Sequence, residues 1–283
     1  MRKIKRIWRK MTGRTSRKQA KTDAARATAA VPEMTPMGFK LAGHDAMGSG
    51  DFEPTETRLV KQILPKVDVF VNVGANIGYY CCLALQAERQ VIAFEPIAEN
   101  VQHLLSNVRA NNWEALIEVY PLALSDRIGV IDIYGWGTWA SVIKGWAGTA
   151  ERHVTQVPTN RLDNVLAARL ENRRSLILVD IEGAEFLMLA GAHRILEQTC
   201  APIWLIEISI DEHQPNGLPI NPRLRETFDL FWRSGYQAWT ATDDPRPVEP
   251  ADVDHVVASG TNLLGTHNFL FIKSQLMSEL LAH

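Results

Sequence analysis

Cysteine is scarce in this chain of 283 residues, and long apolar runs are absent from it. Its three cysteines are Cys81, Cys82 and Cys200, and the first two are adjacent within an apolar stretch. That spacing suits neither a disulfide framework nor a zinc site, so we expect buried thiols in a reducing compartment. No apolar run reaches the roughly 18 residues that a membrane-spanning helix needs. These absences predict a cytoplasmic protein with one sizeable core, since 46% of the residues are apolar.

Acidic residues are missing from positions 1–21, which hold ten of the 30 lysines and arginines. The rest of the chain has 20 basic and 32 acidic residues, a net charge of −12, which argues against nucleic-acid binding by the main body. Within this basic arm, Ile4, Ile7, Trp8 and Met11 would form an apolar stripe on a helix. We expect the arm either to contact an anionic membrane at its inner face or to be a disordered or partner-binding tail.

Short apolar runs alternate with amphipathic stretches from residue 51 onward, so we divide the chain into an arm with a linker, 1–50, and one folded domain, 51–283. The expected strands are 68–73, 91–94, 117–124, 130–134, 176–181, 202–208, 236–240 and 269–272, and the expected helices are 77–87, 98–108, 161–170, 185–196 and 224–233. This alternation predicts an α/β fold with a doubly wound, mostly parallel sheet. We expect seven strands in the sheet, with an antiparallel last strand and with 130–134 as an added strand.

A glycine turn, VNVGANIG, lies between the first expected strand and a helix. Its Gly74 and Gly78 would let backbone N–H groups approach a carboxylate or phosphate of a ligand. Glu95 closes the next strand, 21 positions after Gly74, where an acid can accept hydrogen bonds from ribose hydroxyls. The turn lacks the central glycine of a dinucleotide motif, which favours S-adenosylmethionine over NAD. An NAD(P)-dependent oxidoreductase and a non-catalytic nucleoside-binding module stay as alternatives.

The chain also resembles the FkbM family of S-adenosylmethionine-dependent methyltransferases, through a series of motifs in the same order. They are VGANIGYY (73–80), AFEP (93–96), ALSD (123–126), ASV (140–142), RLDNVL (161–166), VDIEGAE (179–185), IEI (206–208) and NFLFI (268–272). The resemblance implies a Rossmann-like class I methyltransferase domain over residues 51–283. It also implies methyl transfer to oxygen, usually a hydroxyl of a sugar, glycan, glycolipid or specialised metabolite.

The same resemblance implies which residues bind the cofactor. They are Gly74, Ala75, Asn76 and Gly78 at its methionine end with Asn72 beside them, Glu95 at the ribose, and Ala123, Leu124 and Ser125 beside adenine. Asn72 stands where the family usually has an acid. Its amide can form a hydrogen bond but cannot offer a carboxylate to the ammonium group of the cofactor.

Acidic residues at the ends of expected strands are the first catalytic candidates. Asp180 and Glu182 lie where the fourth main strand meets its loop, and the resemblance places Asp180 near the sulfonium of the cofactor. Glu207 ends the fifth main strand and would extend an acidic rim toward the substrate. Asp180 and Glu207 could instead be oxygen ligands of a divalent metal, but their spacing does not demand one and we assign no metal. His213, just after the fifth main strand and beside Asp211 and Glu212, is the candidate general base.

The segment after the added strand is too aromatic for an ordinary solvated loop, since it contains Trp136, Trp139 and Trp146 close to glycines. Aromatic faces beside glycine hinges predict a lid that stacks on a sugar or a flat ring. Trp136, Trp139 and Ser141 would then contact the substrate. A packed cap over the edge of the sheet is the alternative.

Overall fold

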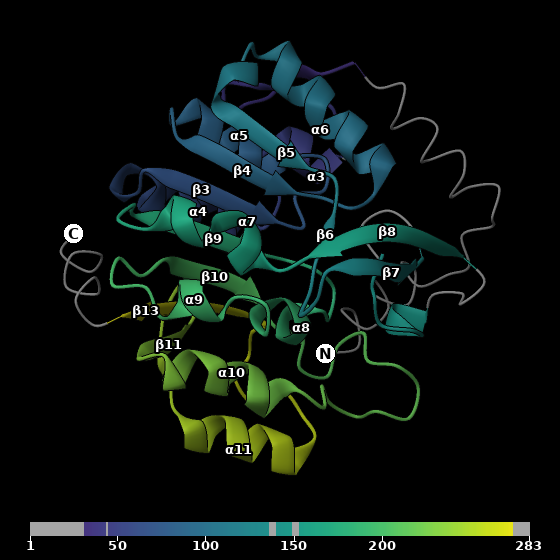
Figure 1. Cartoon of the computed structure of the whole chain (residues 1–283), viewed down its shortest axis with the longest axis vertical. Coiled ribbons are helices and arrows are strands. Elements are labelled where there is room, and N and C mark those ends of the chain that lie inside the picture. Colours follow the sequence, from purple (N-terminus) through teal and green to yellow (C-terminus); the bar gives the residue numbers. More distant parts are fainter. Residues whose placement is uncertain (1–30, 44, 136–139, 149–152, 274–283) are drawn as a thin grey trace.

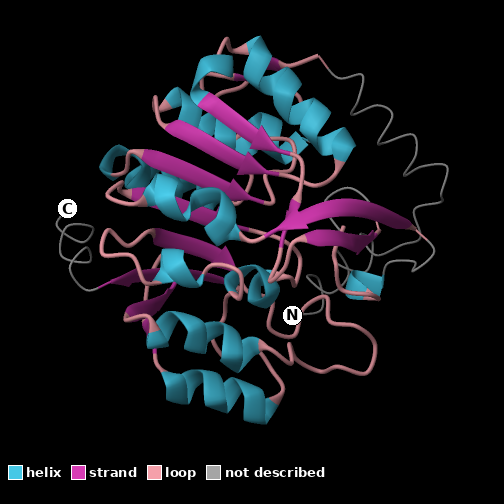
Figure 2. Cartoon of the chain, in the orientation of Figure 1, coloured by secondary structure: helices cyan, strands magenta, loops and turns pink. Residues whose placement is uncertain are grey.

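The computed structural model describes residues 31–43, 45–135, 140–148 and 153–273. Its main sheet consists of β3 (Val69–Val73), β4 (Gln90–Phe94), β5 (Ile117–Tyr120), β9 (Ser175–Val179), β10 (Ile203–Glu207), β11 (Tyr236–Thr240), β12 (Pro247–Val248) and β13 (Asn268–Lys273). The strands lie in the order β12-β11-β13-β10-β9-β3-β4-β5. Figure 2 shows the strands of the sheet in magenta between the helices. Neighbouring strands from β10 to β5 are parallel, and β13 runs antiparallel between β10 and β11. The predicted α/β class, the mostly parallel sheet and the antiparallel last strand are confirmed.

Two details of the predicted sheet are wrong. Among the described residues the sheet has eight strands, because the two residues of β12 pair with β11 at the edge. The predicted strand 117–124 ends at Tyr120, because Pro121 has no N–H to continue the ladder. Ala123 and Leu124 form the separate strand β6 (Ala123–Leu124), which belongs to another sheet.

Helices cover both faces of the main sheet (Figure 1). One face carries α3 (Asp45–Ser49), α4 (Pro54–Ile63), α5 (Tyr79–Gln86) and α6 (Ala98–Ala110), and the other carries α7 (Leu162–Leu170), α8 (Glu185–Leu189), α9 (His193–Leu196), α10 (Leu224–Arg233) and α11 (Pro250–Ser259). Successive strand side chains point to opposite faces, so Val69 and Val71 join one apolar cluster and Phe70 joins the other. Burial of both faces explains why these strands are almost continuously apolar.

The helices differ from the prediction in two respects. The predicted helix 185–196 is divided into α8 and α9, and Gly191 between them lies so close to the Ser125 carbonyl that a side chain would not fit. Helices α3, α4 and α11 were not predicted, although Pro54 and Pro250 stand in the first turns of α4 and α11, where proline is favoured.

The stretch expected as a linker is partly folded onto the domain. Strands β1 (Glu33–Met34) and β2 (Lys40–Leu41) form a hairpin, and Phe39, Leu41 and Met47 are buried in the same cluster as α5. Residues 31–50, where the structure describes them, therefore contribute to the core. The basic arm, 1–21, lies outside the described residues, and the division at residue 50 stays a prediction. In the described part of the chain no helix is long and apolar enough to cross a membrane.

A small second sheet stands beyond the carboxyl ends of the central strands (Figure 1). Strand β8 (Val154–Asn160) pairs parallel with β6 and antiparallel with β7 (Gly129–Tyr134). Strand β7 confirms the predicted added strand. Strand β8 was not predicted, because its sequence VTQVPTN is polar and mostly exposed and contains a proline. Its pairing partner β7 lies well before it in the sequence, and local periodicity does not reveal a pairing between separated segments.

Candidate functional site

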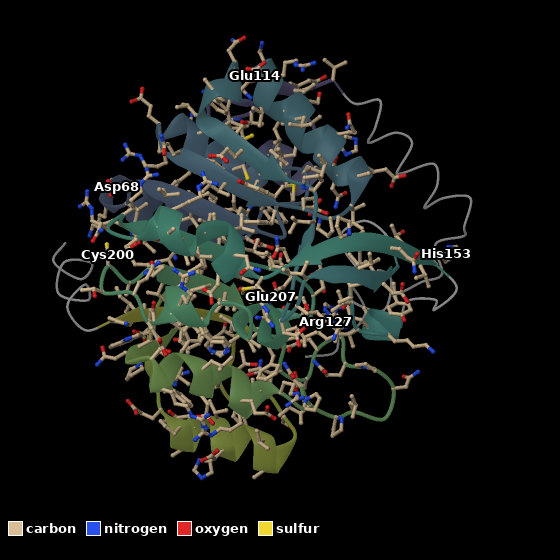
Figure 3. The ribbon with its side chains drawn as sticks, in the orientation of Figure 1. Asp68, Glu114, Arg127, His153, Cys200 and Glu207 are labelled. Atoms are coloured by element: carbon tan, nitrogen blue, oxygen red, sulfur yellow. The ribbon has the colours of Figure 1, made fainter. Side chains whose placement is uncertain are left out.

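The order of the parallel strands reverses at β3, which has β4 on one side and β9 on the other. Doubly wound sheets bind ligands outside the carboxyl ends of their strands at such a switch point. A cavity of about 680 Å³, counting its open mouth, lies here. Its walls come from the segments that follow β3, β4 and β9 and from β6 and β7. Figure 3 shows Glu207, at the carboxyl end of β10, well away from Asp68, which precedes β3 at the opposite edge.

Gly74 allows the ends of β3 and β9 to meet beside the cavity. Its φ is +83°, and a Cβ built there would lie 1.8 Å from the Asp180 carbonyl oxygen. The Gly74 N–H donates to the Phe94 carbonyl at 2.9 Å, and the Asp180 N–H donates to the Val73 carbonyl at 3.0 Å. The position therefore requires glycine for both its backbone conformation and its space.

The other residues of the turn divide between the cavity and its support. Asn76 lines the cavity. Ala75 and Gly78 do not: Ala75 is 3% exposed and packs in the core, and Gly78 (φ +87°) precedes α5 against Leu104. These two residues shape the turn that presents Asn76. The sequence therefore located the turn correctly, but it did not distinguish the residue that lines the cavity from the residues that support it.

Glu95 lines the cavity and organises the adjacent backbone. Its carboxylate accepts hydrogen bonds from the Asn76 N–H at 2.8 Å, the Ile97 N–H at 2.9 Å and the Asn100 side-chain amide at 3.2 Å. Burial raises the pKa of Glu95, and these donors oppose that rise. Its oxygens retain acceptor capacity for ribose hydroxyls. Asn100 was not predicted, although it lies one turn into the helix that follows Glu95.

Asn72 faces α5 and does not line the cavity. Its side-chain amide donates to the Cys81 sulfur at 3.6 Å, and the residue is 2% exposed. Its Oδ1 atom is buried without a hydrogen-bond partner in the described part of the chain. The structure therefore does not bring Asn72 together with the other predicted cofactor residues.

Strand β6 supplies an apolar part of the wall. Ala123 and Leu124 line the cavity, together with Ile133 of β7. Ser125 does not, because it is buried and its hydroxyl donates to Asp126 Oδ1 at 3.0 Å. Apolar walls with a few convergent polar groups are typical of cofactor sites, and these side chains suit a flat heterocycle.

The wall formed by the segment after β9 is acidic, since Asp180 and Glu182 both line the cavity. Burial, reinforced by the charge of Glu182, raises the pKa of Asp180 to about 7. Burial also raises the pKa of Glu182, against the effect of a hydrogen bond from Trp146. None of the described residues that line the cavity is a lysine, arginine or histidine. Such a site favours a cationic ligand and disfavours a pyrophosphate.

Glu182 is held by the segment that follows β7. The Ser141 hydroxyl donates to the Glu182 carbonyl at 2.5 Å, and the Trp146 indole N–H donates to Glu182 Oε2 at 2.7 Å. Ser141 is 1% exposed and Trp146 is 2% exposed, as expected of a packed cap and not of a lid. Ser141, predicted to contact substrate, uses its hydroxyl to support Glu182. The predicted substrate residues Trp136 and Trp139 lie outside the described residues.

His213 lies beside Glu182 as well. Its Nδ1 atom is 3.9 Å from Glu182 Oε2, and its ring centre is 6.0 Å from that of Trp146. Burial lowers the pKa of His213. Glu212, expected to orient His213, accepts the Ile210 backbone N–H instead and lies 3.7 Å from the Nδ1 atom of another histidine, His267.

Glu207 lies one strand further along the same edge and does not line the cavity. Burial, followed by the charges of Asp180 and Glu182, raises the pKa of Glu207 well above its usual range. His267, just before β13, was not predicted, because it approaches this edge only through strand pairing. Its interaction with Glu212 raises its pKa. Among the described residues, no group of three or more His, Cys, Asp or Glu side chains is arranged to hold a metal ion.

The sheet order with its reversed last strand, the glycine turn at the switch point and the acid at the end of β4 define a class I S-adenosylmethionine-dependent methyltransferase. The model of the FkbM methyltransferase domain matches residues 72–238, and the chain belongs to this family. S-adenosylmethionine is accordingly its cofactor. The alternatives of an NAD(P)-dependent oxidoreductase and a non-catalytic module are replaced by this assignment.

Several solved methyltransferase structures are similar to this chain. The FkbM methyltransferase from Methylobacillus flagellatus KT is 15% identical with a TM-score of 0.43, and the match covers 88% of this chain and 59% of that one. The precorrin-6y C5,15-methyltransferase from Geobacter metallireducens GS-15 is 9% identical with a TM-score of 0.42, and the match covers 83% of this chain and 94% of that one. Aeropyrum pernix fibrillarin with bound S-adenosylmethionine is 11% identical with a TM-score of 0.37, and the match covers 72% of this chain and 65% of that one. The chain thus spans 59% of the length of the Methylobacillus protein. None of the curated proteins matches it.

Proposed function

We propose that this methyltransferase transfers its methyl group to a hydroxyl oxygen of a sugar, glycan, glycolipid or specialised metabolite. The proposal rests chiefly on the acidic end of the cavity, which Asp180 and Glu182 line and where His213 lies beside Glu182. A hydroxyl must lose its proton when its oxygen is methylated, and a carboxylate or a neutral imidazole can accept that proton. A phosphate or carboxylate as the acceptor would meet like charge at this point.

The residues of the cavity suit the three parts of the cofactor. Gly74 and Asn76 would adjoin the methionine end, Glu95 would accept hydrogen bonds from the ribose hydroxyls, and the apolar wall of β6 would flank adenine. When bound, S-adenosylmethionine supplies a methyl group that its positive sulfonium has already activated. Asp180 and Glu182 favour that charge through their own negative charge.

His213 is the proposed general base. Its lowered pKa keeps the imidazole neutral near pH 7, so that a ring nitrogen can accept the hydroxyl proton. Glu182, 3.9 Å from Nδ1, would stabilise the imidazolium that forms. Positioning of the acceptor would contribute on the order of 7–11 kcal/mol. Glu207, one strand away, would accept a hydrogen bond from a further hydroxyl of the acceptor.

The decisive experiment labels the product. Metabolite and glycan extracts from cells that lack this protein are incubated with the purified enzyme and S-adenosylmethionine carrying a ¹³C methyl group. We expect new ¹³C resonances at the chemical shift of methyl ethers, and mass spectrometry of the labelled species identifies the acceptor. Label found only on nitrogen, carbon or sulfur would overturn O-methylation and leave the cofactor assignment intact.

We further propose that the basic arm, residues 1–21, contacts the anionic inner face of a membrane and brings the enzyme to a lipid-linked acceptor. Ten positive charges without an acid support this, since each basic residue near such a surface contributes about 1 kcal/mol. The full chain should co-sediment with vesicles containing phosphatidylserine, and a chain without residues 1–21 should stay in the supernatant. Equal sedimentation of the two chains, or equal binding to pure phosphatidylcholine vesicles, would reject membrane contact. The cytoplasmic location stays a prediction.

A further inference from the structure

Three segments that are distant in the sequence meet at Glu182. The segment after β7 bonds to both ends of this residue, through the Ser141 hydroxyl to its carbonyl and through the Trp146 indole N–H to its carboxylate. The segment after β10 joins the same assembly, since the Ala147 N–H donates to the His213 carbonyl at 2.8 Å. Glu182 thus lies where the cofactor cavity borders the proposed base.

The backbone at this point is unfavourable unless other groups hold it. Glu182 has φ 53°, in the left-handed region that side chains other than glycine rarely adopt, and Gly183 follows with φ +90°. The Trp146 ring packs directly on Gly183, and a Cβ built at Gly183 would lie 2.5 Å from the ring. A left-handed residue other than glycine is energetically unfavourable and persists only where its surroundings determine it. Here Trp146 supplies both the packing and a hydrogen bond.

We propose that Trp146 is a positioning residue for methyl transfer, which holds the Glu182 carboxylate against the wall of the cofactor cavity. This inference goes beyond the proposed function and depends on the cofactor alone, because it requires neither a particular acceptor nor methylation of oxygen. It also gives the segment after β7 a role that a passive cap does not have.

A fixed carboxylate at this wall distinguishes the two forms of the cofactor by charge. S-adenosylmethionine carries a positive sulfonium, whereas the product S-adenosylhomocysteine carries a neutral thioether at the same place. The two compounds share their adenosine, carboxylate and ammonium groups. Glu182 therefore strengthens binding of the first compound more than that of the second, and Trp146 preserves this difference by restricting where the carboxylate can lie.

The test compares the affinities of the two compounds by titration calorimetry on the full chain. Glu182→Gln should reduce the preference for S-adenosylmethionine over S-adenosylhomocysteine about tenfold. Trp146→Phe keeps an aromatic ring over Gly183 but removes the indole N–H, and we expect it to reduce the preference about threefold. Trp204→Phe is the matched control, because its buried indole N–H donates to the Tyr236 hydroxyl at 3.2 Å, away from the cavity. The control should leave the preference unchanged.

A merely structural role for Trp146 would lower both affinities by the same factor, and that result would overturn the inference. An unchanged preference in Trp146→Phe would overturn it as well. If this variant fails to fold, Ser141→Ala serves in its place, since it removes the hydroxyl that donates to the Glu182 carbonyl and accepts from the Ile143 N–H, and it should shift the preference in the same direction. Failure of the unmodified protein to bind either compound would contradict the cofactor assignment instead.

Discussion

The proposed cofactor half of the site, around Glu95, and its proposed acceptor half, around Asp180 and Glu207, lie at one edge of the main sheet but differ in the hydrogen bonds of their carboxylates. In the cofactor half, Glu95 accepts three hydrogen bonds from neighbouring N–H groups. In the acceptor half, Asp180 and Glu207 end adjacent strands, and neither side chain has a hydrogen bond to the described residues. The first arrangement is complete without acceptor, whereas the second retains hydrogen-bonding capacity for one.

This difference suggests that the hydrogen-bonded carboxylate stabilises the fold, whereas the carboxylates without such bonds are available for the reaction. A satisfied buried carboxylate rigidifies the turn that it binds, and removing it leaves N–H groups unpaired. Unsatisfied neighbouring carboxylates repel one another and cost stability, a cost that is common where a site must receive substrate. The two halves should therefore respond in opposite ways to substitution, which the following four experiments examine.

The largest effect on stability is expected for Gly74→Ala, which would disrupt the place where the ends of β3 and β9 meet between the two halves of the site. The added methyl group would collide with the Asp180 carbonyl and force a left-handed conformation on alanine. We expect the free energy of unfolding to fall by about 4 kcal/mol in urea denaturation. Gly217→Ala is the control, with φ +91° and open space around it, and should lose only about 1 kcal/mol. Similar losses in the two variants would show that the close approach is unimportant.

His213→Gln should separate acceptor chemistry from cofactor binding. Loss of the proposed base should lower kcat by about 100-fold or more, with little change in the affinity for S-adenosylmethionine. Steady-state kinetics with the identified acceptor and calorimetry with the cofactor measure the two quantities. His255→Gln, in the exposed part of α11, is the control and should retain full activity. A normal kcat in the His213 variant would mean that His213 is not the general base and would leave the carboxylates as the candidates.

Glu95→Ala should affect the cofactor half alone. It removes the proposed ribose ligand and leaves the Asn76 and Ile97 N–H groups without their acceptor, at a cost of about 1–3 kcal/mol in stability. The thermal shift produced by S-adenosylmethionine should disappear. The exposed Glu99→Ala is the control and should keep the shift. A full shift in the Glu95 variant would remove Glu95 from the cofactor site.

Asp180→Asn should stabilise the acceptor half while impairing function, which is the smallest and most informative effect. The pKa of Asp180 is raised from 3.8 to about 7, so the folded state binds a proton that the unfolded state has already released. Stability contributed by this group is therefore present near pH 4 and is lost as the pH rises toward 7. The amide cannot ionise, so at pH 8 the variant should be about 1–2 kcal/mol more stable than the native protein.

The comparison that checks this sign is denaturation of both proteins at pH 5 and at pH 8. The gain in the variant should shrink at pH 5, where Asp180 is protonated. Glu99→Gln, an exposed acid of α6, should show no gain at either pH. A variant that is less stable than the native protein at pH 8 would mean that the ionised Asp180 carboxylate makes stabilising contacts in the folded protein.

Much of the fold could be predicted because the central strands are apolar on both faces and end in glycine or acid. Strand β8 and the end of β5 could not, since the first is polar and the second depends on one proline within an otherwise apolar run. In the site, Gly74, Glu95, Asp180 and Glu182 could be named from their places at strand ends, and all four line the cavity. Residue type alone did not separate them from Asn72, Gly78 and Ser125, which do not line the cavity.

The amino-acid sequence by itself determined the alternation of strands and helices, the glycine turn, the acid that follows it and the family, because these depend on local periodicity and on residue types at short spacings. Only the tertiary structure decided that Trp146 and Ser141 hold Glu182 and that His213 adjoins Glu182. It also decided that Glu207 lies beside Asp180, with no hydrogen bond from its side chain to the described residues. Those contacts join residues that are mostly tens of positions apart. They exist because strands distant in the chain pair side by side and bring their carboxyl ends to one edge.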